Sequence, residues 1–465
     1  MLIQGGMGVA ISDWHLAQTV SRLGQLGVIS GTGIDTVLVR RLQDGDPGGH
    51  MRQAIAHFPL PQVAEATLKR YFLPEGRSPG TPYKLLPLYR HGGTRTGEEL
   101  LMLAAFVEVY LAKAGHNGPV GMNLLTKVQH PNLALLYGAM LAGVDAILMG
   151  AGIPRDVPAA LDALAEHQPA TLTFDIEGLP ANESAHLSLE PAVHWPTPPP
   201  PLRRPQFLPI VASNSLATML ARKASGRVDG FIIEGPTAGG HNAPPRGEMQ
   251  LNAHGEPLYG PRDAVDLVKI RQLELPFWLA GGVGSPDGLR QALDAGAVGI
   301  QVGTLFAYCD ESGLAEPLKR AVLAEAVAGK VRVRTDPRAS PTGYPFKVVE
   351  WSGEGAAAKR SRVCDLGYLR TAYRRPDGHI AFRCASEPLD TYVAKGGTLA
   401  ETVGRECLCN ALMANVALGQ VRADGPNEPP LLTSGDDLQV IDTFLAGHTH
   451  YTAADVIAYL LASVR

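Results

Sequence analysis

Val228-Asp-Gly-Phe-Ile-Ile-Glu-Gly-Pro-Thr-Ala-Gly-Gly-His241 joins an apolar run to a glycine-rich loop that ends in a histidine. The apolar part, residues 228–233, is too short for a helix and rich in β-branched and aromatic residues, so it predicts a strand buried on both faces. Glycine lets the loop backbone approach a bound anion or flat ring closely. His241 would then stand beside that group. Taken alone, His241 has the alternative interpretation of a solvated loop histidine.

The same unit, a short apolar run that ends in glycine and leads into a helix, recurs along the chain. Strands are expected at residues 2–8, 26–33, 119–125, 145–152, 208–214, 228–233, 275–284 and 298–304. Helices are expected at residues 13–23, 35–43, 49–58, 96–116, 132–143, 155–166, 216–224, 262–272 and 286–295. A further strand-like run at 170–176 leads into an insertion and is left out of the count. Eight parallel strands with intervening helices close into a (β/α)8 TIM barrel, which places the chain in the α/β class.

Two insertions and a long tail interrupt the alternation. Residues 59–93 carry repeated prolines and are expected to form an ordered excursion over the surface, with a lid as the alternative. Residues 177–205 contain the polyproline run Pro196–Pro201 and predict a hairpin followed by a stiff connection. We therefore expect a barrel domain over residues 1–324 and a mostly helical C-terminal extension over residues 325–465. Amphipathic helices at 405–416 and 453–464 would pack against the barrel or a second subunit, which leaves a homodimer open.

Charge and composition exclude several classes of partner. The chain has 41 basic and 45 acidic residues and a formal charge of −4, so it has no electrostatic footprint for nucleic acid or an anionic membrane. No stretch approaches the roughly 20 apolar residues that span a bilayer. The N-terminal residues lack the pattern of a secretory signal. These features predict a cytoplasmic protein.

The cysteines are concentrated in the predicted extension. Cys364, Cys384, Cys407 and Cys409 lie there, and Cys309 alone lies in the barrel. Five cysteines are too few and too unevenly placed for a disulfide framework, which agrees with a reducing compartment. Four thiols in one region could hold a metal or a cluster, but their spacing lacks the paired CxxC knuckles of a zinc ribbon. We predict ordinary thiols and no metal site, and metal ligation stays open as the alternative.

Glycine pairs follow three consecutive predicted strands. Gly281-Gly-Val-Gly-Ser285 follows the seventh strand and Gly303-Thr304 the eighth, where TIM barrels commonly bind phosphate. His241 follows the sixth strand and lies on the same face. A single glycine pair indicates only a tight turn, but three on one face favour a cofactor that carries phosphate. A GxGxxG fingerprint for a dinucleotide is missing from the sequence.

Five ordered motifs resemble those of a known family. They are Gln4-Gly-Gly-Met-Gly8, Gly121-Met-Asn123, Glu234 to Gly239-Gly-His241, Ala280-Gly-Gly-Val-Gly284 and Gln301-Val-Gly-Thr304. This set is similar to that of the nitronate monooxygenases, also called 2-nitropropane dioxygenases, whose relatives include flavin-dependent enoyl reductases. The likeness covers about residues 1–310.

The resemblance implies a barrel that binds FMN noncovalently, with His241 as the catalytic histidine. It implies that the isoalloxazine ring is held by Gly5, Gly6, Met7 and Asn123. It implies that the phosphate is held by Gly240, Gly281, Gly282, Gly303 and Thr304, with Gly239 in the same loop. A histidine with a pKa near neutral would suit proton transfer beside a flavin, or would steady an anionic substrate when protonated. Glu234 departs from the glutamine of many relatives, which puts its contact with the ring in question.

Three functions are compatible with these residues. The first is an FMN-dependent monooxygenase that oxidises alkyl nitronates with O2. The second is an NAD(P)H-dependent flavin reductase that acts on an enoyl thioester or a quinone. The third is a non-catalytic flavin-binding or scaffold protein, which an apolar residue at position 241 would have favoured. The glycines and the histidine are common to the first two, so the sequence barely separates them.

Overall fold

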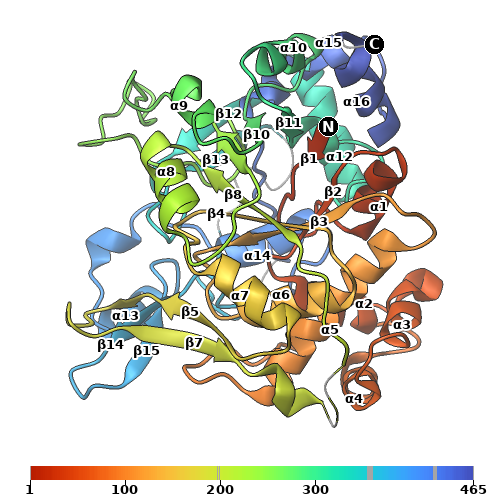
Figure 1. Cartoon of the computed structure of the whole chain (residues 1–465), viewed down its shortest axis with the longest axis vertical. Coiled ribbons are helices and arrows are strands. Elements are labelled where there is room, and N and C mark those ends of the chain that lie inside the picture. The colour runs from red at the N-terminus through yellow and green to blue at the C-terminus, as the bar shows by residue number, and fades with distance from the viewer. Residues whose placement is uncertain (1, 196, 198, 353–359, 423–426, 464–465) are drawn as a thin grey trace.

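Eight parallel strands form the centre of the computed structural model, which describes residues 2–463 except 196, 198, 353–359 and 423–426 (Figure 1). The strands are β1 (Leu2–Gln4), β2 (Gly27–Ser30), β3 (Val120–Leu125), β4 (Ala146–Gly150), β8 (Gln206–Val211), β9 (Phe231–Glu234), β10 (Phe277–Ala280) and β11 (Gly299–Val302). Their order is β1-β11-β10-β9-β8-β4-β3-β2. A parallel bridge between Ile3 and Leu26 joins the two ends of this sheet. The TIM barrel predicted from the sequence is confirmed.

Helices follow the strands and cover the outside of the barrel. They are α1 (Trp14–Arg22), α2 (Ile34–Gln43), α3 (His50–Ile55), α4 (Pro61–Tyr71), α5 (Arg95–Lys113), α6 (Asn132–Leu141), α7 (Val157–Ala165), α8 (Asn214–Lys223), α9 (Leu267–Arg271), α10 (Pro286–Asp294), α11 (Thr304–Ala307) and α12 (Glu316–Val327). The expected N-cap of the first helix is present, because the Asp13 side chain accepts hydrogen bonds from the amides of His15 and Leu16.

Helix α4 was not expected from the sequence. It lies inside the proline-rich insertion at 59–93, for which the sequence predicted an ordered excursion over the surface and no helix. Pro61 occupies the first turn, where a missing N–H costs nothing, and the residues from there to Pro74 include no further proline. The prolines therefore bound this helix and do not interrupt it.

Side chains fill the interior of the barrel. Ile3, Val28, Leu148, Ile232 and Trp278 belong to one buried cluster, to which successive strands contribute. A larger cluster fills the space between the strands and the surrounding helices. Because the interior is packed, a ligand finds room only at an end of the barrel.

Both insertions are joined to the extension. Strands β5 (Ala170–Phe174) and β7 (Ala185–Leu189) form the expected antiparallel hairpin. Between them, β6 (Ile176–Glu177) pairs with β14 (Thr371–Arg374) of the extension. In the other insertion, the backbone N–H of Tyr83 donates to Gln420 Oε1 over 2.7 Å. Pro196 and Pro198 of the predicted polyproline run lie outside the described residues.

The extension contains strands as well as helices. Its strands are β12 (Arg332–Asp336), β13 (Phe346–Glu350), β14 and β15 (Ile380–Arg383), and its helices are α13 (Leu389–Ala394), α14 (Leu408–Asn415), α15 (Ile441–Leu445) and α16 (Ala453–Leu460). Thr452 caps α16, as expected. Val464, the last residue of that predicted helix, lies outside the described residues.

The last part of the extension packs directly on the barrel. Helix α16 contacts α1 and α10, and Figure 1 shows it beside them. Leu438, Ile441, Val456 and Leu460 belong to the same buried cluster as the barrel helices. The expected domain boundary at residue 324 falls within α12. Among the described helices, none combines the length and apolar character that crossing a bilayer requires.

Candidate functional site

A cavity of about 230 Å³ lies at the carboxyl ends of the barrel strands. The twelve residues that the sequence analysis selected all line it. They are Gly5, Gly6, Met7, Asn123, Glu234, Gly239, Gly240, His241, Gly281, Gly282, Gly303 and Thr304. The strands bring these residues together because the carboxyl ends of parallel strands meet at one end of a barrel.

The extension supplies further walls of this cavity. These walls were not foreseen from the sequence. They consist of Phe346, Tyr368, Leu369, Leu408, Cys409, Leu412, Thr433, Ser434, Gly435 and Asp437. The tail therefore contributes directly to the site.

Hydrogen bonds fix the extension to the glycine-rich loop after β9. The backbone N–H of Gly240 donates to Thr433 Oγ1 over 2.8 Å, and the Gly240 carbonyl accepts from the N–H of Lys347 over 2.8 Å. Thr304 Oγ1 accepts from the N–H of Gly435 over 3.1 Å. A Cβ on Gly239 would lie 2.8 Å from the carbonyl carbon of Ser434. The loop and the extension are thus packed backbone against backbone.

The turn after β1 approaches β3 closely. Asn123 Nδ2 donates to the Gly6 carbonyl over 3.1 Å, and a Cβ on Gly6 would lie 2.3 Å from the Asn123 Cβ. Ser12, which the sequence analysis missed, braces the turn because its hydroxyl accepts from the Met7 N–H and donates to the Gly5 carbonyl, each over 2.8 Å. Asn123 Oδ1 is buried and has no hydrogen-bond partner among the described residues. It is an acceptor available to a ligand.

His241 is held by residues of the extension. Its Nε2 lies 2.7 Å from Ser340 Oγ, which in turn lies 2.8 Å from Thr342 Oγ1. The ring packs edge-on against Phe346, with centroids 4.8 Å apart. Nε2 is therefore occupied, and Nδ1 makes no hydrogen bond with the described residues.

The electrostatic setting of His241 differs from the expectation. Burial, with a smaller contribution from the charge of Lys127, lowers the pKa of His241 to about 4. The expectation of a pKa near neutral was wrong, because the sequence does not show how deeply the loop is covered. At neutral pH this imidazole is uncharged, and it can accept a proton or a hydrogen bond.

Glu234 ends β9 beside His241. Its carboxyl group makes no hydrogen bond and no ion pair with the described residues, and burial raises its pKa to about 7. A carboxyl group with this pKa is partly protonated at neutral pH. The site therefore holds two titratable groups whose pKa values are shifted in opposite directions, a pattern common where protons are transferred.

A second chamber of about 270 Å³ adjoins the first. The two share Ala151, Ile210, Glu234 and His241. Tyr344, from the extension, lines this chamber, and Lys127 Nζ lies 3.8 Å from the centroid of its ring. The sequence analysis missed both residues, which have no motif around them. The two chambers give room for a cofactor and a substrate that meet at His241 and Glu234.

The cysteines are free thiols. Cys364 and Cys384 form a side-chain hydrogen bond, and Cys409 lines the first cavity. Within the described ranges, no cluster of three or more His, Cys, Asp or Glu side chains is arranged to hold a metal ion. The alternative of a metal site therefore gains no support from this geometry.

Comparison with known proteins matches the site-bearing part of the chain. Residues 202–340 match the family model described as nitronate monooxygenase. A nitronate monooxygenase of Paraburkholderia phytofirmans is 28% identical over 221 residues, which cover 43% of this chain and 54% of that protein. A probable nitronate monooxygenase of Staphylococcus saprophyticus is 33% identical over 114 residues, or 24% of this chain and 30% of that protein. The chain thus spans about half the length, or less, of these curated relatives.

Solved structures also align along the chain, at low identity. FabK from Thermotoga maritima has a TM-score of 0.46 at 16% identity, and the alignment covers 99% of this chain and 91% of FabK. Nitroalkane oxidase from Streptomyces ansochromogenes has a TM-score of 0.45 at 15% identity, with 100% and 95% covered. Likenesses this distant say nothing about what this chain binds or does. The family-model match and the curated relatives make part of this chain similar to nitronate monooxygenases.

Proposed function

We propose that this protein is an FMN-dependent oxidoreductase that oxidises alkyl nitronates with O2. The observation that carries the proposal is the cavity at the barrel end, which gathers the glycines and His241 and adjoins a second chamber. The match of residues 202–340 to the nitronate monooxygenase family model supports the same reaction class. FMN would occupy the first cavity and the substrate the second.

The residues of the first cavity fit FMN. Two buried acceptors line it without partners among the described residues, Asn123 Oδ1 and Gln301 Oε1, and they suit the N–H donor of a flavin ring. Gly281 and Gly282 have φ of 86° and 68°, which residues with a side chain rarely adopt. Because glycine has no side chain, a bound group can approach the backbone closely at these two positions. Backbone amides in such a turn suit phosphate. Gly5, Gly6, Met7 and Asn123 would hold the ring, and Gly240, Gly303 and Thr304 would complete the phosphate site.

FMN, when bound, would take electrons from the substrate and pass them to O2. The protein's own groups would hold the substrate and manage its proton. A nitronate arrives already deprotonated, so His241 would chiefly position it. Toward a neutral nitroalkane, the uncharged imidazole can act as a base at Nδ1 in the tautomer whose Nε2–H donates to Ser340 Oγ. The ammonium of Lys127 lies close enough to affect His241 and favours an anionic substrate.

Glu234 resolves one difficulty and keeps a second function in view. A carboxylate beside an anionic substrate would repel it, but a pKa of about 7 leaves much of this group neutral. The same proton would serve a reductase, because reduction of an enoyl thioester or a quinone consumes a proton as well as a hydride. This observation favours an NAD(P)H-dependent flavin reductase as the second candidate.

The test is to purify the protein, identify its flavin and mix it anaerobically with each reductant. We expect a yellow protein that releases FMN on denaturation. A nitronate should bleach the flavin faster than NADPH does, and turnover should consume O2. Faster bleaching by NADPH would transfer the assignment to the reductase. A colourless protein that cannot be reconstituted with FMN would remove both candidates.

A further inference from the structure

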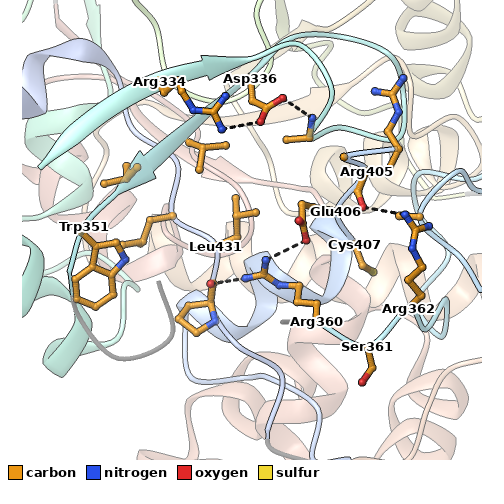
Figure 2. Close-up of a pocket in the computed structure, with 17 residues that line it drawn as sticks. Arg334, Asp336, Trp351, Arg360, Ser361, Arg362, Arg405, Glu406, Cys407 and Leu431 are labelled. Atoms are coloured by element: carbon orange, nitrogen blue, oxygen red, sulfur yellow. Dashed lines mark hydrogen bonds and ion pairs between the residues drawn. The ribbon is translucent and has the colours of Figure 1, made fainter. Parts of the chain in front are cut away.

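The extension contains a cavity of its own, separate from the two chambers at the barrel end. Its volume is about 530 Å³, and every residue that lines it lies between Arg334 and Leu432 (Figure 2). Volumes of roughly 300–1,000 Å³ are typical of sites for small organic ligands. Nothing in the proposed reaction uses this space.

Four arginines line this cavity, of which Arg360, Arg362 and Arg405 form what is called here the arginine side, whereas Arg334 lies on β12 opposite Val348 of β13. Arg334 pairs with Asp336 over 2.8 Å, and Arg360 pairs with Glu406 over 3.2 Å, as Figure 2 shows. The other two, Arg362 and Arg405, contact no carboxylate among the described residues. All of their hydrogen bonds within the described chain go to main-chain carbonyl oxygens. Carbonyl groups satisfy the donors but carry no net charge, so two guanidinium charges stay uncompensated by ion pairs.

The opposite side is apolar. It is formed by Val348, Val349, Trp351, Leu431 and Leu432. In Figure 2, Leu431 lies between the Trp351 side and the arginine side of the cavity. A ligand that fits both sides has an acidic group and an apolar or flat body.

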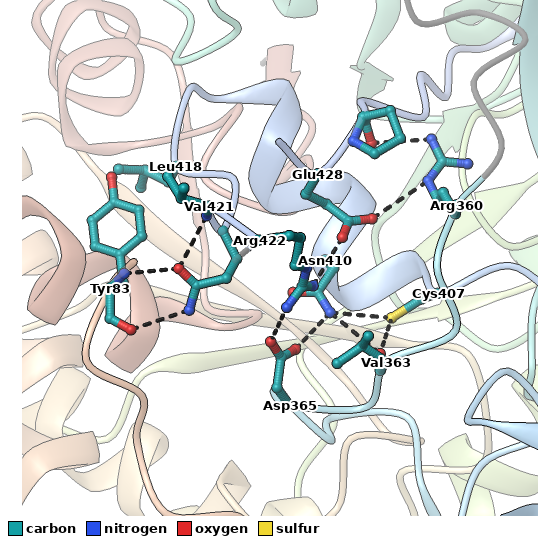
Figure 3. A network of polar contacts seen from close by, with 12 residues as sticks. Tyr83, Arg360, Val363, Asp365, Cys407, Asn410, Leu418, Val421, Arg422 and Glu428 are labelled. Atoms are coloured by element: carbon teal, nitrogen blue, oxygen red, sulfur yellow. Dashed lines mark hydrogen bonds and ion pairs between the residues drawn. The ribbon is translucent and has the colours of Figure 1, made fainter. Parts of the chain in front are cut away.

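A network of polar contacts holds Arg360, one of the arginines of this cavity, in place (Figure 3). Glu428 is 6% exposed and lies between Arg360, at 3.6 Å, and Arg422, at 2.9 Å. Arg422 also pairs with Asp365, which accepts a hydrogen bond from Asn410 over 2.6 Å. Arginines fixed in this way lose little freedom when an anion binds, which favours binding.

We propose that this cavity binds a small organic anion. Its carboxylate or phosphate would lie against Arg362 and Arg405, since guanidinium groups bind both anions well. Its apolar body would lie against Trp351 and Leu431. The proposal does not rest on the nitronate reaction.

Neighbouring residues on the same segments line this cavity and contribute to the site at the barrel end. Ala339 lines it and the next residue, Ser340, holds His241. Leu432 lines it and Thr433 binds the Gly240 amide. Cys407 lines this cavity and Cys409 lines the other. An anion bound here would therefore contact the segments that support the catalytic loop.

Calorimetric titration of the full-length protein tests the proposal with two probes, octanoate for the carboxylate and AMP for the phosphate. Octanamide and adenosine are the uncharged controls. Ser361 is exposed, lines the cavity and makes no side-chain hydrogen bond with the described residues, so Ser361→Trp blocks the cavity without disturbing the core. Ser361→Ala is its matched control. Arg362→Met removes one charge, and Arg375→Met, in an exposed hairpin outside the cavity, is the control for it.

We expect at least one anion to bind with a Kd of about 1 mM or below, and to bind at least about tenfold more weakly to Ser361→Trp and Arg362→Met. The two control variants, Ser361→Ala and Arg375→Met, should bind the anion as the parent does. Which probe binds decides between carboxylate and phosphate. The proposal is overturned if neither anion binds up to about 10 mM, if Ser361→Trp binds like the parent, or if the uncharged analogues bind equally well.

Discussion

Replacing Ser340 with alanine tests whether the extension positions His241, the histidine proposed to be catalytic. Ser340 is fully buried, and its hydroxyl joins His241 Nε2 at 2.7 Å to Thr342 Oγ1 at 2.8 Å. Alanine removes the hydroxyl and leaves Nε2 without a partner in a buried place. A hydrogen bond of this kind contributes about 1–1.5 kcal/mol, which corresponds to a loss of about tenfold in kcat/KM.

The loss should depend on the substrate. Neutral nitroalkane needs His241 as a base at Nδ1, so it should show the full tenfold loss, whereas a preformed nitronate should lose about threefold or less. Thr342→Val, which keeps the direct contact with His241, is the matched control and should cost less. The assay is O2 consumption with both substrates across pH, with FMN content measured in parallel. Parent-like rates on both substrates, with normal FMN content, would refute the positioning role of Ser340.

Three further changes probe the same site. His241→Asn should lose about 10²-fold or more toward neutral nitroalkane and keep a larger share of activity toward nitronate, with normal FMN content, and equal rates would make His241 a bystander. Burial raises the pKa of Glu234 from the ordinary 4.5 to about 7. As pH rises, the unfolded chain therefore loses this proton before the folded chain does, and the free energy of unfolding falls between pH 4.5 and about pH 7. Glu234→Gln removes this loss. The free energy of unfolding in urea should therefore be higher for the variant, relative to the parent, at pH 8 than at pH 4. A difference between the two proteins that does not change with pH would contradict the raised pKa. Gly239→Ala should destabilise the fold by about 1–3 kcal/mol, because its Cβ would lie 2.8 Å from backbone atoms of Ser434 that cannot move aside cheaply. Gly260→Ala, where nothing lies within 4 Å, is the control, and similar thermal midpoints for the two variants would argue against tight packing of the extension.

The barrel and the first cavity were predictable because both follow from local patterns. The barrel strands are short apolar runs, most of which lead into glycine, and parallel topology alone brings the glycine turns to one end. Residues after β1, β3, β9, β10 and β11 could therefore be assigned to one site without knowledge of any contact.

The supporting residues could not be predicted in this way. Ser340 contacts His241 across 99 positions of the sequence, and it lies in a segment with no periodicity or motif. Thr433 and Phe346 reach the loop in the same way. The pKa of His241 depends on how completely these segments cover it, which is a property of packing and not of the local sequence. Only the position of the histidine was accessible from the sequence.

The first cavity takes its walls from both ends of the chain, and this bears on when it can hold a ligand during synthesis. Gly5 and Gly6 leave the ribosome before the other residues of the site, whereas Thr433, Ser434 and Gly435 leave it long after all eight barrel strands have emerged. A nascent barrel thus exposes its glycine turns to solvent until the tail arrives. A ligand bound there would be enclosed only after residues 433–437 have folded onto the barrel, and a chain that ends prematurely after β11 would leave that cavity open on one side.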